Sequence, residues 1–88
     1  MTDSTLSIIT NKVVDITNIY AGYVKKAECR GISVLQAAGK ENLKDLENEI
    51  DDVLTILLND FSQDKRTNLY NQMVVVMNAV NSALLDDF

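Results

Sequence analysis

The chain has 88 residues, with thirteen acidic and eight basic side chains, a net charge of −5 and no histidine. The missing histidine excludes Ser-His-Asp and Cys-His catalysis and imidazole metal sites, and the single cysteine excludes an intramolecular disulfide and a Cys₄ zinc site. Because 47% of the residues are apolar, the composition predicts one small folded domain over residues 1–88.

The first predicted element is a helix over residues 4–30. Its apolar side chains recur at alternating steps of three and four, which is the spacing of one helix face. They are Leu6, Ile9, Val13, Ile16, Tyr20, Tyr23 and Ala27. Three further residues are expected to widen this face: Ile8, Ile19 and Val24. Asp3 or Ser4 is expected to cap the first turn, and Gly31 to follow the last one as the C′ residue.

Residues 31–40 connect this helix to the next and contain two of the three glycines. Ser33 can cap a short helix at 33–38 that stops at Gly39. An ordered loop and an extension of the first helix are the alternatives, and we favour the short helix.

The second long helix is predicted over residues 41–61, and it has the clearest amphipathic pattern of the chain. Its apolar face is Leu43, Leu46, Ile50, Val53 and Leu57, widened by Leu54, Leu58 and Phe61. The opposite face is polar, so one side of this helix is expected to be buried.

The third long helix is predicted over residues 65–86, after a break at 62–64. Its apolar residues are Leu69, Tyr70, Met73, Val74, Val76, Met77, Val80, Leu84, Leu85 and Phe88. They cover about 200° of a helical wheel, against a little over about 100° for a simple surface helix. This helix must therefore face two neighbours or form an oligomer interface. Three consecutive valines also suggest a strand, but the flanking residues keep the helical period.

The predicted fold class is all-α: an up-down-up bundle of three long helices with a short fourth helix at about 33–38. Its predicted core is Ile9, Val13, Ile16, Leu46, Ile50, Val53, Leu57, Met73, Met77, Val80 and Leu84.

The sequence predicts no catalytic, cofactor-binding or metal-binding residues. Cys29 has basic neighbours, but it lies at the C-terminus of the first predicted helix, and the chain has no histidine to act as its base. We therefore interpret Cys29 as structural. Asp60, Ser62 and Asp64 have the alternating spacing of a calcium loop without its glycine and glutamate, and we interpret them as a turn.

An acidic segment is the candidate partner-binding site: Asp45, Glu47, Glu49, Asp51 and Asp52. A solvated face is the simpler interpretation, since the Glu-x-x-His motif of di-metal bundles is absent. The charge is nevertheless uneven, at +2 over residues 1–40 and −7 over residues 41–88. We therefore expect a protein partner with a basic surface, and no nucleic acid, because a phosphate backbone needs clustered basic residues.

Three residues of the third helix are the predicted self-association site: Val74, Val75 and Leu85. They lie at the edge of the wide apolar arc or outside it, and they predict a homo-oligomer, most simply a twofold dimer. In the alternative, residues 31–40 fold back and cover the surplus with Ile32, Val34 and Leu35.

Two function classes follow. The first is a non-catalytic protein–protein interaction module, such as a small chaperone, an immunity or antitoxin protein, or a regulatory binding protein. The second is a self-assembling structural subunit, for example of a secretion apparatus. The chain resembles needle-type subunits of type III secretion only in its length and its Ser/Thr-rich start, and it lacks their usual proline-containing turn.

The chain is expected in the cytoplasm, or exported without a cleaved signal, and away from membranes.

Overall fold

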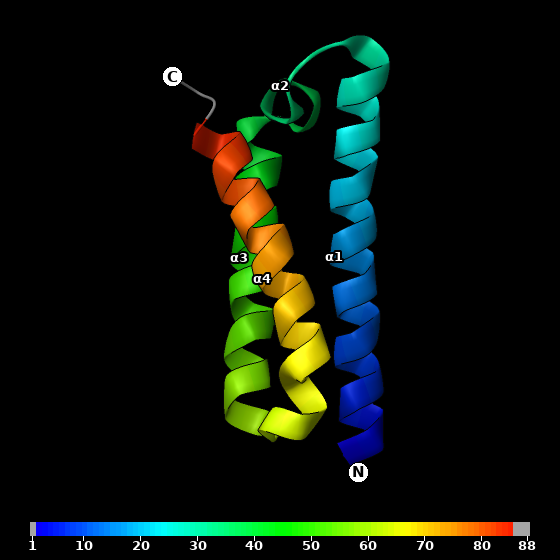
Figure 1. Ribbon diagram of the computed structural model, residues 1–88, viewed down its shortest axis with the longest axis vertical. Coiled ribbons are helices and arrows are strands. Elements are labelled where there is room, and N and C mark those ends of the chain that lie inside the picture. Colours follow the sequence, from blue (N-terminus) through cyan, green and yellow to red (C-terminus); the bar gives the residue numbers. More distant parts are fainter. Residues whose placement is uncertain (1, 86–88) are drawn as a thin grey trace.

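A computed structural model describes the backbone of residues 2–85 and the side chains of 6–64 and 67–85. This part of the chain forms four helices: α1 (Thr2–Arg30), α2 (Val34–Ala38), α3 (Lys40–Asp60) and α4 (Gln63–Leu85). The long helices α1, α3 and α4 run up, down and up in a bundle 44 Å long, and α1 stands beside the α3–α4 hairpin (Figure 1). The predicted all-α bundle is confirmed.

The core is built from one row of apolar side chains on each long helix. Each row repeats at steps of three and four, so one stripe of every helix faces the other two. The rows are Ile9, Val13 and Ile16 on α1, Leu43, Leu46, Ile50, Val53 and Leu57 on α3, and Met73, Val76, Val80 and Ala83 on α4. Burial of a large aliphatic side chain contributes about 1.5–3 kcal/mol, so these rows hold the bundle together.

Met77 and Leu84, which were predicted for the core, pack against it but are not among its buried residues. Both are half-buried, and the neighbouring Val76 and Ala83 are buried instead. On α4 the row between α1 and α3 is covered from both sides, whereas a row turned toward one neighbour stays partly in water. The apolar arc of α4 is so wide that the sequence does not indicate which of its rows of side chains lies between α1 and α3.

The end of α1 confirms the prediction for Gly31, which has a left-handed φ of +64°. The backbone N–H of Ile32 donates to the carbonyl of Ala27 at 3.0 Å, and that of Gly31 donates to the carbonyl of Glu28 at 3.4 Å. These two bonds form a Schellman motif, in which glycine adopts the left-handed position without the steric cost of a Cβ.

The predicted short helix is confirmed as α2, and its cap is the predicted Ser33. The backbone N–H of Gln36 donates to Ser33 Oγ at 3.1 Å, and the backbone N–H of Ser33 donates to Gln36 Oε1 at 3.2 Å. This reciprocal pair is a capping box. Gly39, at a φ of +89°, ends α2 and precedes the first residue of α3.

Helix α2 lies across the upper end of the bundle, near the end of α4 (Figure 1). It contacts all three long helices, and Val34 and Leu35 pack half-buried against the core. Residues 31–40 therefore cover apolar surface at this end, but not the surplus on the third long helix that the alternative assigned to them. Val75 and Leu85 remain exposed.

The helix starts differ from the predictions at two places. Helix α1 already includes Thr2, so Asp3 and Ser4 lie inside the helix and the prediction that one of them caps it is wrong. Helix α4 begins two residues early, at Gln63, directly after the break between α3 and α4. The predicted end at 86 and the predicted apolar Phe88 lie outside the described residues. None of the described helices is long and apolar enough to cross a membrane.

Candidate functional site

The five predicted acidic residues all lie on α3, in the middle part of the helix. Asp45, Glu49, Asp51 and Asp52 are exposed, and Glu47 is half-buried. The buried row of α3 behind them fixes the helix, so the carboxylates project from a rigid support. We call these five residues the acidic surface.

The acidic surface is divided into two rows. At about 100° per residue, Asp45, Glu49 and Asp52 fall within about 60° of one another on one side of α3. Glu47 and Asp51 follow on the other side. The outward face of the helix, with the exposed Asn48, lies between the two rows. A partner that sits on this outward face would therefore contact carboxylates on both of its flanks.

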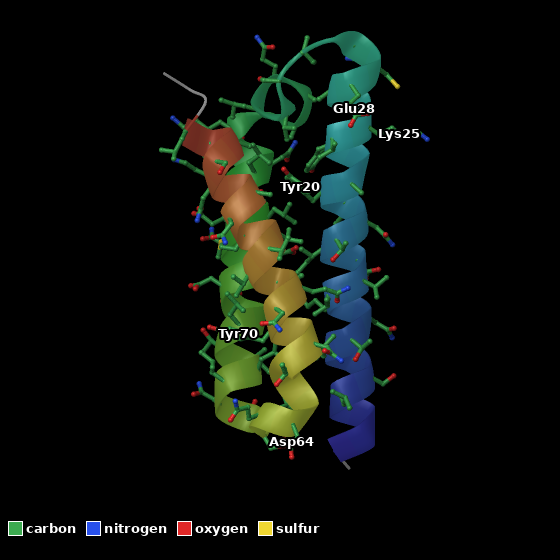
Figure 2. All side chains as sticks on the ribbon, viewed as in Figure 1. Tyr20, Lys25, Glu28, Asp64 and Tyr70 are labelled. Atoms are coloured by element: carbon green, nitrogen blue, oxygen red, sulfur yellow. The ribbon has the colours of Figure 1, made fainter. Side chains whose placement is uncertain are left out.

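The chemistry of the described residues is limited. No group of three or more cysteine and acidic side chains comes together to hold a metal ion in the described part of the chain. Burial raises the pKa of Tyr20, whose side chain lies on the side of α1 that faces the other helices (Figure 2) and packs against the core. This tyrosine is therefore a rim residue of the core.

Cys29 lies in the last turn of α1 and is exposed as a free thiol. Its basic neighbours Lys25, Lys26 and Arg30 are also exposed, and Lys25 points away from the bundle (Figure 2). The thiol is therefore accessible to solvent.

The predicted self-association residues do not lie on one face. Val74 is half-buried, while Val75 and Leu85 are 67% and 62% exposed. Val75 lines a hollow of about 360 Å³ together with Thr17 of α1, so it lies on the side of α4 that faces α1. Leu85 lies about 80° further around the helix and about 15 Å along it. Self-association through these residues stays a prediction.

A second hollow, between α3 and α4, has a volume of about 280 Å³. Leu58, Tyr70 and Thr67 line it, with Gln63 and Asn71. Leu58, expected to widen the apolar face of α3, is 50% exposed at this place. The hollow mixes apolar and amide groups and holds no charged side chain among its lining residues.

Sequence reasoning missed a face of α1. Ile8 and Ile19 were expected to widen the buried face, but they are 65% and 43% exposed. They line a hollow of about 450 Å³ along α1. Its wall also includes Lys12 and Asp15 of α1 and Glu49 of α3. The exposed isoleucines share the helical spacing of Lys12 and Asp15, but that spacing does not itself indicate whether α3 covers these side chains.

Comparisons with known proteins found no family model, no curated protein and no solved structure that matches this chain.

Proposed function

We propose that this protein is a non-catalytic protein–protein interaction module whose acidic surface on α3 binds a basic surface of another protein. The observation that carries the proposal is the concentration of five carboxylates within about 10 Å of one helix. The pairs Asp45–Glu49 and Glu47–Asp51 are one helical turn apart and repel each other weakly, and a cationic partner would relieve that repulsion.

The charge distribution supports the same proposal. The net charge of −7 over residues 41–88 gives α3 and α4 a negative field, which accelerates the approach of a positive partner. Exposed charges interact over about 8–10 Å at physiological ionic strength, so salt should slow this association. The same field repels nucleic acid and anionic membranes, and we propose neither as a partner. The exposed free thiol of Cys29 favours a reducing compartment such as the cytoplasm.

The test compares two variants with the same net charge. The variant D51K/D52K reverses two carboxylates within the acidic surface, and D60K/D64K reverses two carboxylates at the α3–α4 turn, outside it. The wild type is used as bait in native extracts, and the captured protein is identified by mass spectrometry. Its rate of association with the wild type and with each variant is then measured with purified components.

We expect D51K/D52K to slow association at least about tenfold and to weaken its salt dependence, because it removes the local attraction. The control D60K/D64K should bind nearly as the wild type does. Equal binding by all three proteins would show that the acids are only a solvated face. Equal loss in both variants would show that net charge, and not this surface, determines binding.

A further inference from the structure

The exposed face of α1 contains four side chains in one stripe. Ile8, Lys12, Asp15 and Ile19 fall within about 60° of one another on a helical wheel, and the two isoleucines within about 20°. All four are exposed, and all four line the hollow of about 450 Å³ between α1 and α3. Two isoleucines in water on one stripe are an apolar surface that the fold itself leaves uncovered.

The stripe is complementary to its own reversed copy. Ile8 and Ile19 lie equally far from the midpoint between Val13 and Val14, and so do Lys12 and Asp15. If two copies of α1 lie antiparallel about this midpoint, each Ile8 meets an Ile19 and each Lys12 meets an Asp15. A parallel pair would instead place lysine against lysine and aspartate against aspartate.

We propose that this face of α1 is the docking site for a second copy of the chain, in an antiparallel twofold dimer centred between Val13 and Val14. The contact is isologous, so it closes after two copies. Glu49 of α3 lines the same hollow and offers a further carboxylate to Lys12 of the second copy. One helix from each copy buries less than the about 1,200–2,000 Å² of a standard interface, so this dimer is weak and reversible.

The α1 face competes with the self-association site predicted on α4. Val75 and Leu85 are as exposed as Ile8, but they lie about 80° apart around their helix and have no charged pair between them. A helix docked on α4 would have to cover an arc of about 80° to bury both, against about 20° for the two isoleucines of α1. The α1 stripe, by contrast, buries both isoleucines and pairs both charges in one contact.

The test uses charge reversals on α1. K12D and D15K each turn two attractive contacts of the proposed dimer into repulsive ones, and we expect each to weaken dimerisation about tenfold or more in sedimentation equilibrium. D15K should be the milder change, because Glu49 remains beside the new lysine. When K12D and D15K are mixed, both contacts become attractive again, so a heterodimer should form with about the wild-type affinity.

The mixed dimer carries the same total charge as the wild-type dimer, so net charge cannot explain its recovery. Circular dichroism of each variant checks the fold, and V75E/L85E is the matched change on α4, which should leave the dimer intact. A wild type that stays monomeric at millimolar concentration would overturn the proposal. So would a mixture that remains monomeric, or a dimer lost in V75E/L85E and kept in K12D.

Cross-linking tests the geometry independently of charge. In a C29S background, I8C and I19C replace exposed side chains, so the bundle should still fold. A mixture of I8C/C29S and I19C/C29S should form a disulfide between the two variants. Each variant alone should form few, since like positions lie about 16 Å apart along the helix axis. Efficient cross-linking of either variant with itself would contradict the antiparallel arrangement.

Discussion

Two leucines that are adjacent in the sequence should contribute very differently to the stability of the bundle. Leu57 is fully buried in the core, whereas Leu58 is half-exposed beside α4. We expect L57A to lower the free energy of unfolding by about 2–5 kcal/mol, through lost transfer energy and the cavity left behind. L58A should cost at most about 1 kcal/mol, because half of its side chain is already in water. Urea denaturation measures both, and a loss below about 0.5 kcal/mol for L57A would place Leu57 outside the core.

Two glycines should respond to alanine with opposite signs. Gly22 lies in the middle of α1, and a Cβ there would meet no atom within 4 Å. G22A should therefore stabilise the fold by about 0.5–1 kcal/mol, by reducing the entropy of the unfolded chain. G31A should destabilise it by about 1 kcal/mol, because an L-residue at a φ of +64° is strained. Thermal melts of the two variants should move in opposite directions, and a shift of the same sign would contradict this assignment.

Tyr20 gives the fold a sensitivity to alkaline pH. Burial raises its pKa above the ordinary value of 10.0, so the folded state keeps this proton after the unfolded state has lost it. The contribution of the neutral phenol is complete below pH 10 and is lost as pH rises through that value toward the folded-state pKa. Stability measured against pH should therefore fall more steeply in the wild type than in Y20F. Parallel curves would show that the Tyr20 hydroxyl does not couple folding to pH.

At the scale of the element, α2 closes one end of the bundle. Val34 and Leu35 project from α2 onto the core, and the helix contacts α1, α3 and α4. We expect V34S/L35S to cost about 2–4 kcal/mol and to expose this end to solvent. Amide exchange should then accelerate in α2 and in the adjoining end of α4 more than in the middle of α3. A uniform acceleration along the chain would show that α2 has no local closing role.

The element boundaries were predictable where a local chemical signal specifies them. Gly31 and Ser33 indicated the end of α1 and the start of α2, because a left-handed glycine and a capping box are formed by adjacent residues. The buried row of α3 was also predictable, because the apolar stripe of this helix is narrow. The wide arc of α4 was not, since the choice between Val76 and Met77 depends on where α1 and α3 pack. Likewise, the spacing of Ile8 gave no indication that α3 leaves it uncovered.

The candidate sites differ in how far the sequence alone could predict them. The acidic surface keeps its exposure because charged residues opposite a buried row must point outward. The division into two rows also follows from the helical period. Val75 is separated from Val74 and Leu85 because the arc of α4 extends around both sides of the buried row. The face of α1 could be recognised only after the position of α3 was known.

At the scale of the whole molecule, charge and topology act together. The positive segment 1–40 contains α1 and α2, and the negative segment 41–88 contains most of α3 and all of α4. Folding therefore places α1, whose net charge is only +1, beside an acidic hairpin, so the negative field of the molecule comes from α3 and α4. The same separation of charge lets the molecule present an acidic surface on α3 to a partner, and a self-complementary face on α1 to a copy of itself.

The topology also predicts how the chain folds. The turn between α3 and α4 is two residues long, α2 joins its neighbours through short connections, and helical contacts are mostly local. Such bundles fold in microseconds to milliseconds, and a chain without proline has no isomerisation step of tens of seconds. We therefore expect stopped-flow refolding at low protein concentration to give one fast exponential phase. A slow phase whose rate increases with concentration would report association, as in the proposed α1 dimer. A phase of tens of seconds that is independent of concentration would show that the assembly of these helices is itself slow, contrary to this expectation.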